Sequence, residues 1–385
     1  MRVLHTSDWH LGRTFHGSSL HAEQAVALQA TVDAVRAEAI DVVIVAGDLY
    51  DRQLPPLDAV HLLSWALEEL RGAGAAVVAI SGNHDSGRRL GFAEGLLARS
   101  GVHLWGDVRA AGSAVVVPAE DGGPDLGVYP IPYLEPEVAR HQLGTPEQRT
   151  HDGLLRVALD RARRDRSGRP PGRTIAVAHA FVAGGTSCDS ERVLRVGGSD
   201  RVAASAFAGF DYVALGHLHG RQVIGDGRIR YAGSPLPYSF SERDQTKGVW
   251  VLDLPAGGAV RVSPLDLPAA RRLATLRGPL DDLLTSRAHA HAENCWVAAT
   301  LTDQVPPREA MARLRRRFPH AVTLSHEPPV APGNDTGTYA DRVRTSDDLM
   351  LIDGFVSHVT GRPLSAEERR ECAEAVDDAA RGEAA

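Results

Sequence analysis

The sequence predicts an α/β fold whose strands run parallel. Five short apolar runs, most of them rich in β-branched residues, have the length and composition of buried strands. Apolar residues at helical spacing over residues 20–39 and 57–70 separate the first three runs, as expected where crossover helices join parallel strands. Asp, Asn or His follows each run at once. Because the carboxyl ends of parallel strands share one edge of a sheet, we expect these polar side chains to converge on one crevice.

The polar residues after the five strands form five short motifs. In chain order they are Asp8-Trp9-His10, Gly47-Asp48, Gly82-Asn83-His84-Asp85, His179 and Gly216-His217-Leu218-His219. Taken singly, a histidine at a strand end is usually a hydrogen-bonded structural residue, and an aspartate before a helix is usually a cap. Five such motifs at five strand ends instead predict a functional site.

Length and composition limit the class of protein. With 385 residues, of which 43% are hydrophobic, the chain can bury a large core, and its length suggests two or three domains. A net charge of -7 argues against coating nucleic acid by bulk electrostatics, so a DNA contact has to come from local patches, metals or a partner. Three isolated cysteines fit a reducing compartment, and no apolar run reaches the roughly 18 residues of a membrane helix. These features predict a cytoplasmic protein without a membrane contact.

The middle of the chain predicts further elements and one surface. Residues 91–98 and 154–162 have helical patterns, and residues 102–128 contain short runs broken by Gly and Asp, typical of antiparallel strands. The two helical segments before and after Asn83 carry more apolar residues than one sheet needs. These residues form either core or a helical dimer interface, and they are Leu62, Leu63, Trp65, Phe92, Leu96 and Leu97.

The carboxyl-terminal part predicts a small module and a helical tail. Residues 255–258 mark a boundary, residues 265–272 have the composition of a linker, and a strand, a helix and a strand follow at 296–301, 306–318 and 321–325. A Pro-, Gly- and Asp-rich break at 328–337 precedes two helical patterns at 347–359 and 365–380. We therefore predict three domains, at 1–255, 265–335 and 340–385.

The two tail helices have distinct signals. Ser365-Ala-Glu-Glu368 is a capping box at the start of the second helix. The first helix carries an apolar stripe that a helix pair this small cannot bury alone, formed by Leu349, Ile352, Phe355, Val356 and Val359. The stripe predicts a partner surface.

The residue types in the motifs predict a centre for two divalent metal ions. The candidate ligands are Asp8, His10, Asp48, Asn83, His179, His217 and His219. Asp48 is the candidate bridge, because one carboxylate can hold two cations roughly 3.5–4 Å apart, the spacing used for in-line displacement at phosphorus. Four imidazoles among seven ligands disfavour calcium and favour manganese, iron or zinc. Two such cations against two carboxylates leave a positive pocket that suits an anionic phosphodiester.

His84 and Asp85 are candidates for catalysis rather than metal binding. An imidazole beside the metal ligand Asn83 can protonate a leaving oxygen or stabilise charge on phosphorus near pH 7. Asp85 is placed either to orient His84 or to cap the following helix.

The five motifs resemble the five signatures of the calcineurin-like metallophosphoesterases. The resemblance is more specific for residues 6–12, 46–51 and 233–242, which are similar to the SbcD family of bacterial DNA nuclease subunits, and it continues into the tail. That family is the bacterial counterpart of the nuclease in the double-strand-break repair complexes of archaea and eukaryotes.

The resemblance implies a four-layer α/β/β/α core, a small capping domain and carboxyl-terminal helices that dock on the coiled coil of an SbcC-type ATPase, with two copies of each subunit. It also implies a homodimer through amino-terminal-domain helices and a nucleoid-associated function in DNA repair, recombination and replication. The implied activity is manganese-dependent: an ATP-stimulated 3' to 5' exonuclease on duplex ends and an endonuclease on hairpins and single strands.

The resemblance also implies roles for individual residues. Asp8, His10, Asp48 and His219 would hold one metal, and Asp48, Asn83, His179 and His217 the other. Arg13 and His16 stand where the family touches the DNA backbone, the alternative being an ordinary exposed loop. Some relatives have a histidine where this chain has Asp51, so we assign that position no catalytic role.

Two alternatives remain at this stage. Residues 47–52 also resemble the phosphoprotein phosphatases, but that branch expects an arginine before Gly-Asn-His and a glutamate after it, where this chain has Ser81 and Asp85. The second alternative is a scaffold subunit that has kept the fold and lost catalysis. The seven intact candidate ligands and His84 give that alternative no support.

Overall fold

The computed structural model describes residues 1–119, 122–191, 201–268, 271–329 and 348–382. The chain divides into two compact units, Met1–Thr300 with Arg308–Ser325, and Leu301–Pro307 with His326–Ala385. No helix in the described ranges is both long and apolar enough to cross a membrane.

The first sheet has six strands in the order β16-β15-β1-β4-β5-β6. β1, β4, β5 and β6 are parallel, whereas β15 and β16 are antiparallel to their neighbours. The bounds are β1 Arg2–Thr6, β4 Val42–Val45, β5 Ala76–Ile80, β6 Val102–Trp105, β15 Gly248–Asp253 and β16 Arg261–Asp266. All four residues of β4 are buried, which explains its unbroken apolar run.

The second sheet also has six strands, in the order β13-β14-β12-β9-β8-β7. β8, β9, β12 and β14 are parallel, and β7 and β13 are antiparallel at the two edges. The bounds are β7 Val115–Val117, β8 Leu126–Ile131, β9 Arg173–His179, β12 Tyr212–Gly216, β13 Gln222–Ile224 and β14 Ile229–Tyr231.

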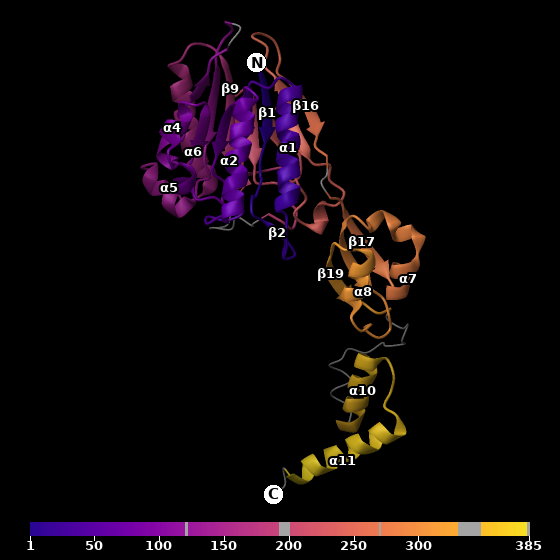
Figure 1. The fold of residues 1–385 in the computed structure, drawn as a ribbon. Coiled ribbons are helices and arrows are strands. Elements are labelled where there is room, and N and C mark those ends of the chain that lie inside the picture. The colour runs from indigo at the N-terminus through magenta and orange to yellow at the C-terminus, as the bar shows by residue number, and fades with distance from the viewer. Residues whose placement is uncertain (120–121, 192–200, 269–270, 330–347, 383–385) are drawn as a thin grey trace. The chain divides into compact units, whose positions relative to one another are not determined.

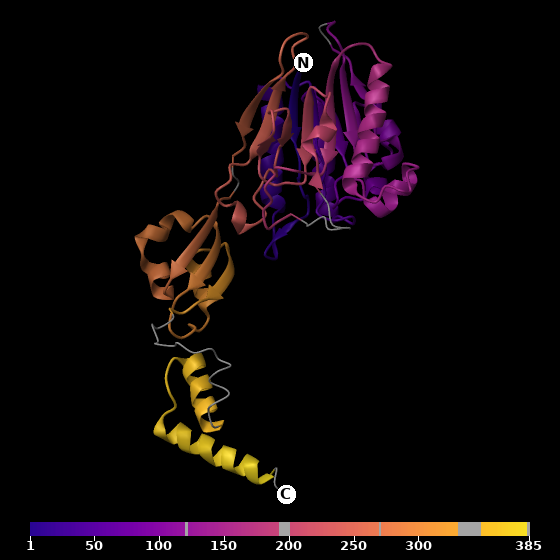
Figure 2. The same ribbon diagram turned by 180° about the vertical axis from the view of Figure 1, so that it is seen from behind.

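The two sheets face each other, and helices cover their outer faces. One apolar cluster between the sheets joins Val3, Val42 and Ile44 of the first sheet to Ile175 and Val177 of the second. Each such side chain that is removed from water contributes about 1.5–3 kcal/mol, so this cluster holds the sheets together. Figure 1 shows α1 and α2 over the first sheet, and Figure 2 shows the second sheet with α6 from behind. The predicted four-layer α/β/β/α arrangement is confirmed.

The helices of this core are close to the predicted segments. α1 is His21–Ala37, α2 is Leu57–Gly72 and α6 is His151–Ser167. Shorter helices and turns complete the core: α3 Gly87–Leu90, α4 Glu94–Ala98, α5 Pro136–Gln142, η1 Val108–Ala110, η2 Ala204–Phe207 and η3 Phe240–Glu242. Two small two-stranded sheets are formed by β2 Thr14–Phe15 with β3 Ser18–Ser19, and by β10 Phe181–Val182 with β11 Arg201–Val202.

Three sequence predictions need correction. The run 102–105, predicted among antiparallel strands, is β6 and pairs parallel to β5, whereas β7 and β8 are antiparallel as predicted. The helix predicted over 91–98 is replaced by α3 and α4, because Ala93 adopts a left-handed backbone with φ 60° between them. Residues 255–258, predicted as a boundary, form the loop between β15 and β16, and part of the predicted linker is strand β16.

A second, smaller α/β module follows. Its sheet has the order β17-β18-β19, and its elements are β17 Leu273–Gly278, α7 Leu280–Thr285, η4 Arg287–Ala292, β18 Trp296–Leu301, α8 Ala310–Arg317 and β19 Ala321–His326. Helix α8 begins later than predicted, because Glu309 before it has a φ of 51° in the left-handed region. Most of the predicted break at 328–337 lies outside the described residues.

Two tail helices complete the chain. They are α10 Asp348–Thr360 and α11 Ala366–Gly382, which pack on each other. The capping box is confirmed, since Ser365 N donates to Glu368 Oε2 at 2.8 Å and Glu368 N donates to Ser365 Oγ at 3.2 Å.

Candidate metal centre

All five motifs lie at the carboxyl ends of neighbouring strands, and the two sheets meet there. β1, β4 and β5 are adjacent in the first sheet, and β9 and β12 are adjacent in the second, with Gly216 paired to His179. Between the sheets, His217 N donates to Asp8 Oδ1 at 3.0 Å, and the His179 ring contacts the Ala46 carbonyl oxygen through Nδ1 at 3.0 Å. The predicted convergence is therefore observed, although it joins the edges of two sheets rather than one.

The backbone is strained where it presents the candidate ligands. Four candidate ligands have φ angles in the left-handed region, which residues other than glycine rarely adopt. The angles are 54° at Asp8, 45° at His10, 52° at Asp48 and 100° at His217. Each such residue costs of order 1–3 kcal/mol and persists only where its surroundings hold it. Residues strained in this way cluster at functional sites, which agrees with the predicted site at this strand edge.

Three glycines make room for the same side chains. A Cβ at Gly47 would collide with the His179 ring, and a Cβ at Gly216 would collide with the Ala46 carbonyl oxygen. A Cβ at Gly82 would collide with the backbone nitrogen and carboxylate of Asp48. The glycines of the motifs are thus required by close packing around the ligands.

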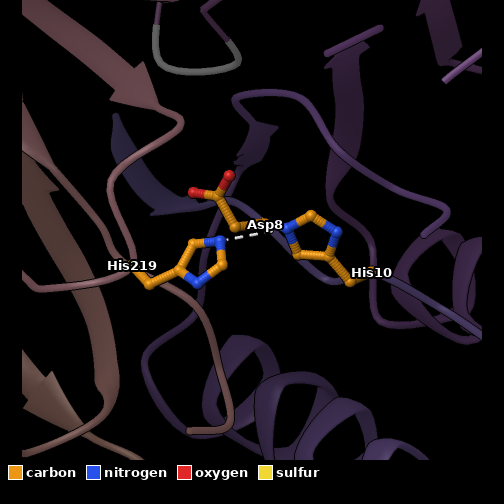
Figure 3. Close-up of side chains that lie close together, drawn as sticks. All are labelled: Asp8, His10 and His219. Atoms are coloured by element: carbon orange, nitrogen blue, oxygen red, sulfur yellow. Dashed lines mark hydrogen bonds between the residues drawn. The ribbon is translucent and has the colours of Figure 1, made fainter. Parts of the chain in front are cut away.

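One part of the centre is built from Asp8, His10 and His219, whose ligand atoms lie within 4.8 Å of one another (Figure 3). His10 Nε2 and His219 Nε2 are 3.1 Å apart. Asp8 is held by Ser7 Oγ, which donates to its Oδ2 at 2.6 Å. All three candidate ligands are buried.

A second part surrounds Asp48. Its Oδ2 lies 3.4 Å from His179 Nε2 and 3.6 Å from His10 Nε2, so the carboxylate stands between the two parts. Asn83 Oδ1 is 2.9 Å from the same His179 nitrogen. Asp8, Asp48 and His179 form another group of mutually close ligand atoms. The ring of His217 lies 5.4 Å from that of His179, but His217 belongs to none of the close groups found among the described residues.

The electrostatics favour a cation at this position. Burial lowers the pKa of His179, but the carboxylates of Asp48 and Asp8 more than offset it and raise that pKa to about 9. Burial raises the pKa of Asp48, yet the imidazoles of His179 and His10 hold it well below its usual range. Burial holds the pKa of His10 and of His217 well below the ordinary value. A metal ion would take the place of the proton on His179, and the residues present fit divalent cations.

His84 lies at the same centre. Its Nδ1 is 2.8 Å from the Asp51 carbonyl oxygen, and its Nε2 is 4.0 Å from Asp48 Oδ2. His84 also forms a close group with His10 and Asp48. Since a carbonyl oxygen only accepts, Nδ1 carries a proton, and Nε2 is the nitrogen that faces the centre.

Asp85 supports the loops beneath the centre. Its carboxylate accepts from the backbone nitrogens of Leu49, Tyr50 and Gly82 at 3.1, 2.9 and 2.9 Å. Asp85 was predicted either to orient His84 or to cap a helix, but the hydrogen bond that orients the His84 ring is made with the Asp51 carbonyl oxygen. Asp85 thus joins the second and third motifs.

The two predicted DNA contacts lie in different environments. Arg13 has a side chain only 16% exposed, lies 4.8 Å from the Tyr238 ring centre, and donates to the Ser190 carbonyl oxygen at 3.0 Å. His16 is exposed and its Nδ1 is 3.1 Å from Thr323 Oγ1. Arg13 is therefore largely engaged within the protein, whereas His16 remains accessible.

Several supporting residues were not found from the sequence. Gln24 donates to the His10 carbonyl oxygen at 2.7 Å, and Tyr238 donates to the Trp9 carbonyl oxygen at 2.5 Å. Near His219 lies a buried ion pair between Glu242 and Lys247, at 2.5 Å. Burial raises the pKa of Glu242, but the nearby His219 ring and the charge of Lys247 lower it to about 2. Tyr238 and Glu242 fell in a segment singled out by resemblance, and no spacing pointed to their contacts.

Comparison with known families shows to which protein family the chain belongs. The family model of the calcineurin-like phosphoesterases matches residues 1–221, more than half of the chain. The chain belongs to the calcineurin-like phosphoesterases. This family uses divalent metals, and a phosphoesterase of this family is a hydrolase. A second model, SbcD_C, described as the type 5 capsule protein repressor C-terminal domain, matches residues 269–353.

Solved structures similar to this phosphoesterase are distant. They include TT1561 of Thermus thermophilus, with 13% identity, a TM-score of 0.37 and coverage of 68% of this chain and 98% of that one. A dimetal phosphatase from Danio rerio has 14% identity, a TM-score of 0.40 and coverage of 70% and 99%. GAP50, the anchor in the inner membrane complex of Plasmodium, has 11% identity, a TM-score of 0.38 and coverage of 86% and 99%. We draw no conclusion from similarities this low.

Proposed function

We propose that this phosphoesterase is a manganese-dependent DNA nuclease that cleaves phosphodiester bonds in duplex ends, hairpins and single strands. The observation that carries the proposal is the convergence of buried carboxylates and imidazoles from both sheets on Asp48. Oxygen and imidazole ligands together suit manganese better than calcium.

In this proposal Asp48 would be shared by two metal ions. Asp8, His10 and His219 would hold the first ion with Asp48, and Asn83, His179 and His217 would hold the second. When bound there, the ions would supply an activated water and charge neutralisation at the phosphoryl group. The 3.1 Å between the facing nitrogens of His10 and His219 supports the first set. The contact of Asn83 with His179 at 2.9 Å supports the second.

His84 acts on the leaving group in this proposal. Its Nδ1 donates to the Asp51 carbonyl, so Nε2 faces the centre and carries the transferable proton when the ring is in its cationic, doubly protonated form. Proton transfer from a positioned imidazole contributes typically 10²–10⁴-fold to a rate. Asp85 acts indirectly, by holding the loops that carry Asp48 and His84.

Two residues favour a phosphodiester over a phosphomonoester. A monoester carries a second negative charge at neutral pH, which calls for a cationic side chain beside the metals. Ser81, which precedes Gly82-Asn83-His84, is buried at 4% exposure and carries no charge. Asp85, which follows, supplies no positive charge, and its carboxylate accepts hydrogen bonds from three backbone amides. A monoester phosphatase is therefore the second candidate.

The match to the SbcD_C model supports DNA as the substrate and an SbcC-type ATPase as the partner. We propose that the pair forms a heterotetramer whose exonuclease runs 3' to 5' and is stimulated by ATP. In this assembly the apolar side of α10 meets the ATPase, because Phe355 and Val359 of that helix are 60% and 64% exposed. His16 is the more accessible of the two proposed contacts with the DNA backbone.

A homodimer is also part of the proposal. Leu62 and Leu63 of α2 belong to the core, so the exposed apolar residues of α2 and of the segment after Asn83 are Leu57 at 69%, Val60 at 38%, Phe92 at 81% and Leu96 at 68%. Together with Leu54, at 63%, these residues form what we call the dimer patch. Isolated exposed apolar residues are common, whereas several on neighbouring segments suggest a contact surface.

The test is cleavage of end-labelled hairpin and linear duplex DNA with Mn²⁺, with and without the ATPase partner, beside a phosphomonoester. His84→Ala should lose about 10²–10⁴-fold in DNA cleavage and still bind two metal ions. Turnover of the monoester without DNA cleavage would favour the phosphatase. Failure to bind metal or to cleave any phosphoester would favour a scaffold subunit.

A further inference from the structure

A chain of hydrogen bonds leads from the His219 ring to the buried Glu242–Lys247 pair. His219 Nδ1 is 2.6 Å from Ser190 Oγ, and Ser190 Oγ donates to Glu242 Oε1 at 2.6 Å. Glu242 Oε2 accepts from Lys247 Nζ at 2.5 Å. We call Ser190, Glu242 and Lys247 the His219 relay.

The direction of each hydrogen bond in the relay is fixed by its members. The Glu242 carboxylate is ionised beside Lys247 and can only accept, so the single hydroxyl proton of Ser190 points to Glu242. The Ser190 oxygen must then accept from His219, which places the ring proton on Nδ1. The relay therefore leaves His219 Nε2 without a proton, and this is the nitrogen that faces His10 Nε2 at 3.1 Å (Figure 3).

The relay is built into the protein at both ends. The Glu242 and Lys247 side chains are 0% and 6% exposed. Lys247 Nζ also approaches the His219 carbonyl oxygen at 2.8 Å and Ser234 Oγ at 3.0 Å, and Glu242 Oε1 accepts from Tyr238 N at 3.1 Å. A buried ion pair is a weak source of stability, because desolvation of both charges offsets their attraction. Stability alone thus gives no reason for placing this pair under a candidate ligand.

The Ser190 end is held by its loop. Arg13 donates to the Ser190 carbonyl oxygen at 3.0 Å, and Glu191 Oε1 accepts from His219 N at 2.8 Å. Asp189 N donates to Ser241 Oγ at 3.2 Å. The loop is therefore fixed to the first motif, to His219 and to the segment that carries Glu242.

We propose that Ser190 and Glu242, with Lys247 holding Glu242, are positioning residues that keep His219 in the Nδ1–H form and aim its Nε2 at the metal position beside Asp8 and His10. The proposal rests on the proposed function, since it assumes a divalent cation at that position. Groups that orient a metal-binding histidine through its other nitrogen typically change metal affinity 10–100-fold when removed. The Ser190 hydroxyl should have an effect of this size on one of the two metals.

The test compares three variants of the full chain. Ser190→Ala removes the hydroxyl, Ser190→Thr retains it, and Ser187→Ala is a matched control at an exposed position of the same loop. In Mn²⁺ titrations by calorimetry, Ser190→Ala should bind one of two ions about 10–100-fold more weakly and the other unchanged. Ser190→Thr should restore the affinity, and Ser187→Ala should match the unmodified chain.

A second measurement needs neither metal nor activity. In metal-free protein with ¹⁵N-labelled histidine, the His219 ring, assigned by its loss in His219→Gln, should show the Nδ1–H form in the unmodified chain. Ser190→Ala should shift this ring toward a mixture of tautomers. The same tautomer and the same two affinities in Ser190→Ala, or equal losses in Ser187→Ala, would overturn the proposal. If no form binds Mn²⁺, the proposed function fails, while the tautomer spectra still decide whether the relay exists.

Discussion

Gly82→Ala tests whether close packing around Asp48 sets the activity. A Cβ at position 82 would lie 2.7 Å from Asp48 Cγ and closer still to the Asp48 carboxylate oxygen and backbone nitrogen, whereas ordinary contact begins near 3.4 Å. Because the carboxylate oxygen and the backbone nitrogen lie closer than Cγ, Asp48 or the Gly82 loop must move by more than about 0.7 Å. Asp48 Oδ1 also accepts from His84 N at 2.9 Å, so His84, the proposed general acid, would move with it.

Two magnitudes follow from this displacement. Forcing an extra carbon into a well-packed site costs about 1–3 kcal/mol of folding free energy. A misplacement near 1 Å in a catalytic centre costs about 10²-fold in rate. We therefore expect Gly82→Ala to remain folded, to lose about 10²-fold in kcat, and to bind metal more weakly.

The assay is Mn²⁺-dependent hydrolysis of a phosphodiester, with urea unfolding in parallel. The control is Gly72→Ala at the end of α2, where a Cβ meets nothing within 4 Å, so activity should be unchanged and stability equal or slightly higher. Full activity and unmodified metal affinity in Gly82→Ala would refute the packing argument. Equal losses in both variants would also refute it.

Three further predictions concern other parts of the chain. Glu242 has a pKa lowered to about 2, so the stability that its ionised form contributes is present above the ordinary pKa near 4.5 and is lost as pH falls toward 2. Glu242→Gln should therefore remove a pH dependence of up to a few kcal/mol from the free energy of unfolding, measured in urea between pH 2 and 5. The same loss of stability in acid in Glu242→Gln and in the unmodified chain would contradict this prediction. Ser365→Ala removes the capping box of α11 and should destabilise that helix by about 0.5–2 kcal/mol. Amide exchange in the first turn of α11 should be faster in the variant than in the unmodified chain, while exchange in α6 should be the same in both. Phe92→Asp in the dimer patch should turn a dimer into a monomer in sedimentation, whereas Val223→Asp, at a residue 48% exposed outside the patch, should not.

The core and the candidate site were largely predictable because each candidate residue lies at the end of a buried strand or within a few residues after it. A run such as residues 42–45 is apolar on both faces only where layers cover it, so it fixes both the strand and the position of Asp48. Edge strands carry a weaker signal. β6 alternates buried and half-buried residues, as an antiparallel strand does, and β16 is mostly exposed with Pro264 in it. Their pairing partners are set by tertiary packing.

The supporting contacts of the site could not be predicted, since they join segments far apart in sequence. Ser190 and Glu242 are 52 residues apart, and neither stands at a spacing that suggests a common role. The left-handed backbone at Asp8, His10 and Asp48 has only a weak signal in residue type, because aspartate and histidine enter this region more often than most residues but usually adopt other conformations. The sequence therefore reveals which side chains reach the centre, and the structure reveals what holds them there.

The central claim is a pair of divalent metal ions bridged by Asp48. Anomalous diffraction at the manganese edge, from crystals grown with Mn²⁺, tests it most directly. We predict two peaks roughly 3.5–4 Å apart on either side of the Asp48 carboxylate, one beside Asp8, His10 and His219 and the other beside Asn83, His179 and His217. A single peak, or two peaks that do not share Asp48, would contradict this account.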